Sequence, residues 1–279
     1  MQGHNTVQLQ VSKYWPESCH AIVRLLLSQG GGERDDDIVA APPHEANGQA
    51  PRTAVGRNLI DHPQIGVNLL ARPGMLRVGD PLYQVALRFT ALGSLETDDM
   101  QLYLLQFPES DTLRLSAVLQ RPRSRGSLRL AGTDPHAPPL IELNLADDRE
   151  DVRRLSEGMR LIWQVAQSPR LAQFLEGTAT LDDGTVLPLA EVIDTLGTDA
   201  ALERYVARGV SEFYHPVGTA RMGPGADSNA AVDQYCRVRG VENLRIVDAS
   251  VMPNITRANT NLTCIMIAER VADWLRSEA

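Results

Sequence analysis

The stretch YHPVGTARMG, residues 214–223, decides how the second half of this chain is interpreted. His215 precedes a proline, and Gly218 and Gly223 bracket the residues that follow, which predicts a rigid loop that presents an imidazole. Because histidine titrates near neutral pH, this side chain is suited to proton transfer. Taken alone, the pattern favours an ordinary hydrogen-bonded structural histidine by about two to one.

Two later stretches place small or polar residues beside an apolar run. The segment VDASVMP, residues 247–253, predicts that a short buried strand over 245–248 enters a turn whose backbone can approach a ligand closely. A simple strand exit with Asp248 capping the turn is the alternative. The segment NTNLT, residues 259–263, supplies good helix caps. A helix amino terminus there would also stabilise a nearby anion, by about 0.3–1 kcal/mol.

Upstream of these stretches, apolar and polar residues alternate with the period of half-buried strands. The alternation predicts strands over residues 83–89, 100–107, 113–120, 127–130 and 140–145. Because no helix intervenes and parallel pairs need long crossovers, the sheet is expected to be antiparallel.

Helices are expected between and after these motifs. Asp147, with Glu150 three residues later, resembles a capping box, and an apolar stripe at helical spacing follows it. Further helices are expected over 170–176, where Gly177 would end the helix, and over 199–208 and 262–276. The predicted fold class is therefore α+β or α/β.

Composition narrows the function classes. The 279 residues carry a net charge of −8, which argues against nucleic-acid binding, because phosphate contacts need clustered lysine and arginine. The three widely spaced cysteines form no CxxC pair, so neither a disulfide framework nor a zinc site is expected. No apolar run reaches the ~18 residues of a membrane helix, and the start lacks the features of a signal peptide. A soluble, cytoplasmic protein is expected.

Several long motifs together resemble one known family. HPVGTARMG, VDQYCRVRGVENLRIVDASVMP and NTNLTCIMIAER, with VGRNLIDHP (55–63) and RPRSRGSLRLAGTDPHAPPLIELN (121–144), resemble the carboxy-terminal portion of the glucose–methanol–choline (GMC) oxidoreductases. The chain resembles the choline dehydrogenase-like members in having His215 and, at the second catalytic position, Asn259. The resemblance implies an antiparallel-sheet substrate domain with helices, plus the carboxy-terminal remnant of a discontinuous FAD-binding domain. The expected divisions are an unreadable, disordered or degraded 1–54, an FAD-domain remnant or linker at 55–80, a substrate domain at 81–209 and an FAD-domain segment with the catalytic loop at 210–279.

The resemblance also implies a reaction and a set of site residues. It implies FAD-dependent oxidation of the CH–OH group of a small-molecule alcohol, with hydride passing to flavin N5 and His215 as the base. Asn259 occupies a position that holds His or Asn in the family, and it is expected to orient the substrate oxygen. The residues expected to contact the cofactor are Asn58, Asp248, Ala249, Asn261 and Thr263.

The sequence departs from the family at its start. No GxGxxG motif is present, and the Gly30–Gly32 triplet precedes acidic residues that would repel phosphate. We therefore expect the amino-terminal FAD-binding βαβ unit to be missing, which puts FAD binding by this chain alone in doubt. A complementing amino-terminal chain or a homo-oligomer would restore the site. The alternative is a non-catalytic, truncated remnant or binding module without flavin.

Two smaller expectations concern other side chains. Asp61 and His62, with His44, lack further ligands at sensible spacing, so no metal site is expected. Ile246 and Ile267 are expected to be partly uncovered, because the family's remaining FAD-domain strands would pack on them.

Overall fold

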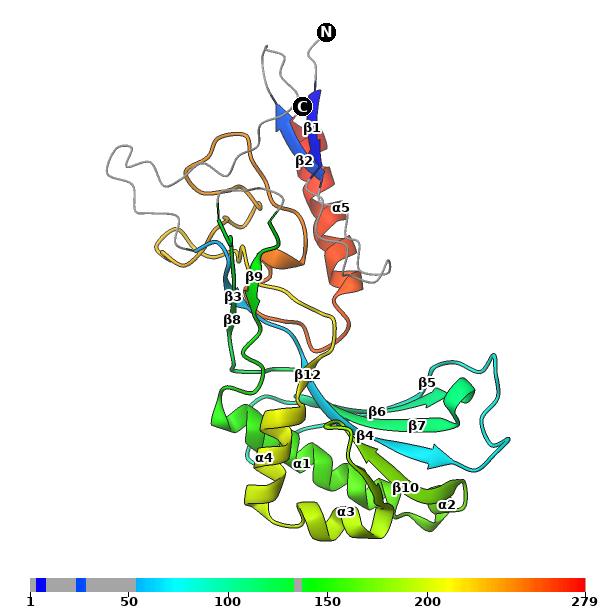
Figure 1. Ribbon diagram of the computed structural model, residues 1–279. Helices are drawn as coiled ribbons and strands as arrows, with labels where there is room; N and C mark the ends of the chain where they lie inside the picture. The colour runs from blue at the N-terminus through cyan, green and yellow to red at the C-terminus, as the bar shows by residue number, and fades with distance from the viewer. Residues whose placement is uncertain (1–3, 9–23, 29–53, 133–136, 279) are drawn as a thin grey trace. The chain divides into compact units, whose positions relative to one another are not determined.

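The computed structural model describes residues 4–8, 24–28, 54–132 and 137–278 (Figure 1). The chain forms two compact units. Unit 1 is drawn from Met1–Ile60, Arg125–Leu143 and Tyr214–Ala279, and unit 2 comprises Asp61–Ser124 and Asn144–Phe213. Most of the stretch 1–54 lies outside the described residues; within it, β1 (His4–Gln8) pairs antiparallel with β2 (Arg24–Ser28).

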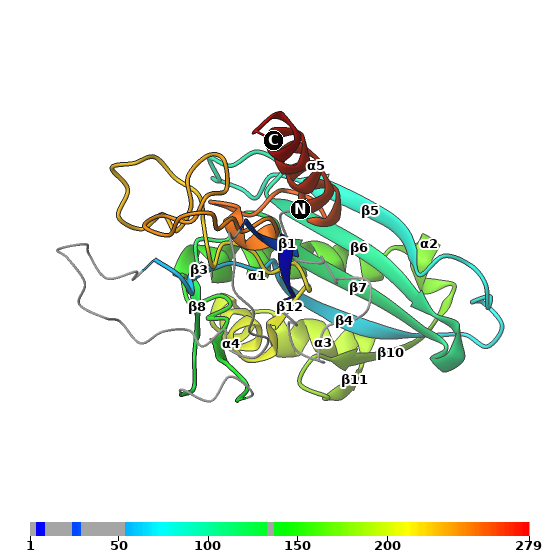
Figure 2. The same cartoon turned by 90° about the horizontal axis from the view of Figure 1, so that it is seen from above.

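Unit 2 is built on a seven-stranded sheet (Figure 2). Its order is β11-β10-β4-β7-β6-β5, with β12 paired to β4, and every pairing is antiparallel. The sheet thus confirms the predicted antiparallel class, and the strands predicted at 83–89, 100–107 and 113–120 are present. The strands are β4 (Pro63–Ala71), β5 (Tyr83–Phe89), β6 (Met100–Phe107), β7 (Thr112–Leu119), β10 (Leu175–Leu181), β11 (Val186–Pro188) and β12 (Ser211–Glu212).

Helices cover one face of this sheet (Figure 1). They are α1 (Arg149–Ala166), α2 (Pro169–Ala172), α3 (Leu189–Leu196) and α4 (Asp199–Gly209). The amino-terminal cap of α1 is Asp148, one residue after the predicted cap, and its carboxylate accepts a hydrogen bond of 2.8 Å from the backbone N–H of Glu150. The predicted apolar stripe of α1 is buried at Leu155, Met159, Ile162 and Ala166, where each large side chain contributes about 1.5–3 kcal/mol.

The structure corrects several sequence-based expectations. The helix predicted over 170–176 ends at Ala172, because Leu175 already begins β10. Gly177 does not end a helix; it has a φ of +85° within β10, where the pairing with β4 shifts register as in a β-bulge. The strand predicted over 245–248 is absent from the described fold, and in its place Arg245 forms an isolated bridge with Arg237.

The unit boundaries also differ from the predicted divisions. Strand β4 lies in the stretch 55–80, which the sequence assigned to a linker, yet it pairs with β7 in the sheet of unit 2. The segment Arg125–Leu143 lies inside the predicted substrate domain but belongs to unit 1, because it pairs with β3 (Arg57–Leu59) there. The assignment of the units to substrate and cofactor stays a prediction.

Besides the β1–β2 pair, the described residues of unit 1 form a three-stranded sheet, long loops and the helix α5. The sheet is antiparallel in the order β3-β8-β9, with β8 at Gly126–Arg129 and β9 at Leu140–Glu142. Helix α5 (Asn261–Glu278) confirms the last predicted helix. Ile267 is buried in the core of this unit with only 8% of its surface exposed, so it is not uncovered as expected, and Ile246 is partly buried. The exposed apolar residues of α5 are instead Leu262, Ile265 and Met266.

Candidate active site

The structure brings together the two predicted catalytic side chains within unit 1. The Asn259 amide nitrogen Nδ2 lies 3.2 Å from His215 Nε2, although 44 residues separate the two in sequence. An amide NH₂ group can only donate, so in this contact His215 Nε2 is the acceptor. It follows that the ring proton is carried by Nδ1, which leaves Nε2 as the basic atom.

Burial favours the neutral form of this imidazole. Desolvation lowers the pKa of His215 below its ordinary value of 6.5, because the charged imidazolium loses hydration when it is buried. At pH 7 the ring is therefore neutral and able to accept a proton. A neutral base held by a carboxamide is suited to removing the proton of a hydroxyl group.

The loop that carries His215 is held on both sides by backbone hydrogen bonds. On one side, Val217 and Ile60 exchange N–H···O bonds of 3.0 and 2.8 Å. On the other, the N–H of Ala220 donates to the carbonyl of Ser250 at 2.9 Å. These backbone bonds place the segment around Ser250 directly beside the histidine loop.

Asp248 and Ala249 lie in this neighbouring segment. The Asp248 carboxylate accepts a hydrogen bond of 2.7 Å from the N–H of Ser250 and caps the short 3₁₀ helix η3 (Ala249–Val251). The carbonyl of Ala249 accepts from the N–H of Gly218 at 3.3 Å. The turn-capping alternative is thus what the geometry displays, and the predicted contact of these residues with a cofactor stays a prediction.

Asn261 and Thr263 lie in the first turn of α5, just after Asn259. Asn261 is exposed and Thr263 is half-buried. The backbone N–H groups of a first helical turn have no partner within the helix, so this turn presents donors and a partial positive charge. Such a helix end fits an anion, and the role of these two residues toward the cofactor stays a prediction.

Asn58 lies where three segments of unit 1 meet. Its amide nitrogen Nδ2 is 3.4 Å from the carbonyl oxygen of Gly218 and 3.5 Å from that of Pro253. Its oxygen Oδ1 accepts a hydrogen bond of 3.1 Å from Arg125 Nε. Sequence analysis missed Arg125, which lies in a stretch of alternating Arg, Pro and Ser that reads as a turn. No spacing signal could have selected it, because 67 residues separate it from Asn58.

The donor set of unit 1 fits the reacting ring of a flavin. A neutral imidazole, a carboxamide and a helix amino terminus meet the needs of a site where a hydroxyl loses a proton and a ring gains negative charge. Among the described residues no cluster of three His, Cys, Asp or Glu side chains forms, and the expectation about a metal site stays a prediction. His62 is buried with its Nδ1 3.2 Å from the carbonyl of Leu119, a structural contact in unit 2.

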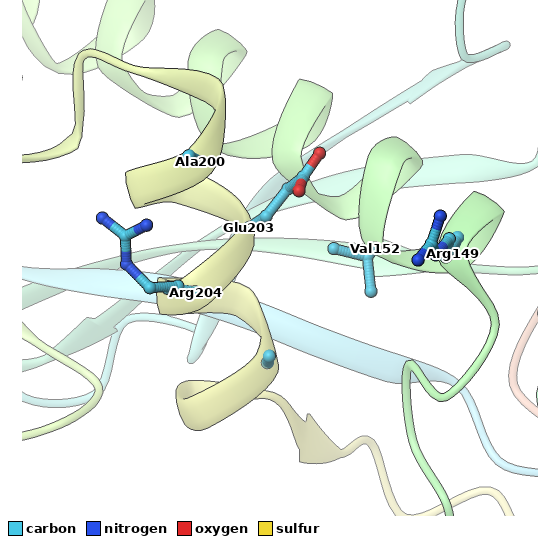
Figure 3. Close-up of a pocket in the computed structure, with 6 residues that line it drawn as sticks. Arg149, Val152, Ala200, Glu203 and Arg204 are labelled. Atoms are coloured by element: carbon cyan, nitrogen blue, oxygen red, sulfur yellow. The ribbon is translucent and has the colours of Figure 1, made fainter.

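A groove in unit 2 lies apart in sequence from the predicted site residues. A groove of about 540 Å³ lies in unit 2 between α1 and α4 (Figure 3), and it contains none of the predicted site residues. Its lining residues are Arg149, Val152, Ala200, Glu203, Arg204 and Ala207. Within the part of the chain that the structure describes, every helix is too short or too polar to cross a membrane.

A histidine–carboxamide pair lies beside a helix amino terminus, and comparison with known proteins identifies the family. The family model described as GMC oxidoreductase matches residues 122–268, more than half of the chain. The chain belongs to the GMC oxidoreductase family.

Individual relatives agree with this assignment. The chain is 35% identical to the 5-(hydroxymethyl)furfural oxidase of Methylovorus sp. (strain MP688), over 82% of this chain and 45% of that protein. It is 31% identical to the choline oxidase of Arthrobacter globiformis, over 80% of this chain and 41% of that protein. The chain therefore spans about half the length of the curated relatives it matches.

A solved structure supports the fold. The pyridoxine 4-oxidase from Mesorbium loti aligns with a TM-score of 0.66 and 24% sequence identity, over 81% of this chain and 44% of that one. At this identity the likeness concerns the fold alone.

Proposed function

We propose that this chain carries the proton-accepting half of an FAD-dependent oxidoreductase that acts on the CH–OH group of a small-molecule alcohol. The observation that carries the proposal is the 3.2 Å contact between Asn259 Nδ2 and His215 Nε2. Membership of the GMC family and the lowered pKa of His215 support it. On this proposal, unit 1 belongs to the cofactor domain and unit 2 to the substrate domain.

The chemistry divides between the cofactor and the protein. FAD, when bound, would supply the acceptor for the hydride that leaves the carbinol carbon. His215 Nε2 accepts the hydroxyl proton, which leaves the carbonyl product. In the free protein Asn259 occupies the Nε2 lone pair, so an entering hydroxyl displaces the amide N–H, which can then donate to the substrate oxygen. Asn58, Asp248, Ala249, Asn261 and Thr263 are the proposed cofactor contacts.

Two measurements test the proposal on the purified chain. Bound flavin is detected by absorbance at about 450 nm, first in the protein as purified and then after FAD is added. The flavin-loaded protein is then assayed with 5-(hydroxymethyl)furfural and choline, the compounds in the relatives' names, as trial alcohols. His215→Ala is expected to lower turnover by ~10²-fold or more with flavin still bound. Unchanged turnover in this variant would contradict the assignment of the base.

A non-catalytic role is the second candidate. Leu262, Ile265 and Met266 on α5 expose apolar surface, which is consistent with a chain that needs a partner to complete its cofactor domain. A colourless chain that binds no added FAD would support this role. A complementing chain or a homo-oligomer remains part of the proposal, and it is tested by whether flavin colour appears when the chain is mixed with the complementing chain.

A reducing, cytoplasmic location is also proposed, supported by the free thiols of Cys236 and Cys264.

A further inference from the structure

Asn58 occupies an unusual backbone position in β3. Its φ is +61°, in the left-handed region that asparagine tolerates better than most residues. The pairing of β3 with β8 shifts register between Arg57 and Leu59, so Asn58 is the bulged residue of the strand. A bulge re-aims its side chain, and here the carboxamide is directed at two loops.

Those two loops carry the proposed catalytic pair. Gly218, whose carbonyl faces Asn58 Nδ2 at 3.4 Å, follows His215 by three residues. Pro253, whose carbonyl lies 3.5 Å from the same nitrogen, precedes Asn259 by six residues. One amide therefore bridges the chain segments that deliver the imidazole and the carboxamide.

The bridge lies where the direct contact between the loops is longest. The backbone bond nearest His215, from Gly218 N–H to the Ala249 carbonyl, measures 3.3 Å, whereas the next two along the ladder measure 2.9 and 2.8 Å. A Cβ on Gly218 would lie 2.4 Å from the Asn58 carbonyl oxygen and 2.8 Å from its Nδ2, so the loop is pressed against this residue. Gly218, with a φ of +91°, is the residue that permits this approach.

Arg125 holds the bridge in place. Its Nε donates to Asn58 Oδ1 at 3.1 Å, and a charged donor makes a stronger hydrogen bond than a neutral one. With Oδ1 held by Arg125, the NH₂ group of the amide is the end that faces the two carbonyl oxygens. The Arg125 guanidinium thus sets the orientation of the Asn58 amide, and the amide N–H groups face the carbonyl oxygens of Gly218 and Pro253.

We propose that Asn58, oriented by Arg125, is a positioning residue that fixes the Asn259–His215 contact by bridging their two loops. This inference deepens the proposed function and rests on it for its catalytic consequence. The positioning role itself can be tested without flavin, because the Asn259–His215 contact determines which imidazole nitrogen carries the proton.

The test reads that proton directly. The full chain is labelled with ¹⁵N-histidine, and the imidazole nitrogens of His215 are assigned among the six histidines with a His215→Gln variant. The native chain is expected to hold His215 as the Nδ1–H tautomer. Asn58→Gly removes the amide without backbone strain, since glycine accepts the positive φ. In this variant the tautomer is expected to shift toward the mixture of a free imidazole, and the pKa of His215 to move.

Asn58→Asp is the matched variant. A carboxylate keeps the contact with Arg125 but cannot donate to the two carbonyls, so the fold is preserved while the bridge is lost. It is expected to give the same tautomer shift as Asn58→Gly. In flavin-loaded protein, both variants are expected to lower kcat by about tenfold, with KM changed by less than ~3-fold.

Three outcomes are distinguishable. A tautomer shift in both Asn58 variants and in Asn259→Ala supports the proposal. A shift in Asn259→Ala alone, with both Asn58 variants unchanged from the native spectrum, overturns the positioning role and leaves the proposed function intact. No shift in Asn259→Ala means that the pair itself does not form, which overturns the positioning role together with the geometry on which the proposed function rests.

Discussion

Arg154 is expected to be the most costly single residue to remove from unit 2. Its side chain is 2% exposed and pairs with two carboxylates that are fully buried, Asp99 at 3.0 Å and Asp151 at 2.7 Å. Asp151 also accepts the backbone N–H groups of Arg123 and Ser124, at 2.9 and 2.7 Å. The network therefore ties the turn after β7 to helix α1, and Arg154→Leu would leave two buried carboxylates without their counter-ion.

Breaking a buried pair from one side costs about 3–5 kcal/mol, against a total stability of about 5–15 kcal/mol for a domain. With a urea m-value of about 1–3 kcal/mol/M, the unfolding midpoint should fall by roughly 2 M. The chain has three tryptophans, so Trp15→Phe and Trp274→Phe leave Trp163, buried in α1, as the reporter of unit 2. Its fluorescence then follows unit 2 alone during urea unfolding.

The neighbouring arginine supplies the control. Arg153 pairs with Glu150 at 2.6 Å and Glu157 at 3.3 Å, but its side chain is 39% exposed. Surface pairs contribute about 0–1 kcal/mol and are screened by salt, so Arg153→Leu should move the midpoint little, and less still at high salt. A midpoint for Arg154→Leu that matches that of Arg153→Leu would refute the reasoning.

Two further predictions concern single hydroxyl and imidazole groups. Tyr205 donates to the carbonyl of Gly66 at 2.7 Å and accepts the N–H of Asp182 at 2.9 Å, and burial raises its pKa far above 10. Tyr205→Phe leaves the Gly66 carbonyl and the Asp182 N–H without this hydroxyl partner and should lower the free energy of unfolding by about 1–3 kcal/mol in the same urea assay. Tyr235→Phe, at an exposed ring, should leave the free energy of unfolding almost unchanged. The pKa of His215 is lowered by desolvation, so the unfolded chain binds this proton more readily than the folded chain. Its contribution to stability is therefore present above pH ~6.5 and lost as the pH falls through the lower folded pKa. The unfolding free energy of the native protein minus that of His215→Gln should therefore become smaller as the pH falls below ~6.5, and a constant value of this difference from pH 8 to 5 would contradict the lowered pKa of His215.

Local periodicity predicted β6 and β7 at the observed positions, although both faces of these strands are buried over much of their length. Strand β4 was missed because PQIGVNLLA begins with proline and contains Gly66, although burial alternates along much of this strand. Strand β10 was missed because Gly177 reads as a helix terminator, although in the sheet it serves a bulge.

The proposed catalytic pair could be selected from motifs, whereas the residues that support it could not. His215 and Asn259 each stand in a long, recognisable segment, so the resemblance places them without any geometry. The Arg125–Asn58 contact joins a turn-like stretch to a bulged strand, and which arginine reaches the amide depends on the β3–β8 register. Tertiary pairing of this kind has no local sequence signal.

The geometry of the pair and the presence of an activity are separate questions. The contacts described above for His215 and Asn259 lie within unit 1 and require no cofactor. A non-catalytic chain of the same family would therefore keep the same pair, the same tautomer and the same lowered pKa of His215. The enzymatic and non-catalytic proposals differ instead in cofactor retention, because Asp248 already uses its carboxylate to cap a turn and the sequence contains no GxGxxG motif. Flavin binding by the purified chain is the measurement that separates them, and the imidazole spectrum is the one that tests the site itself.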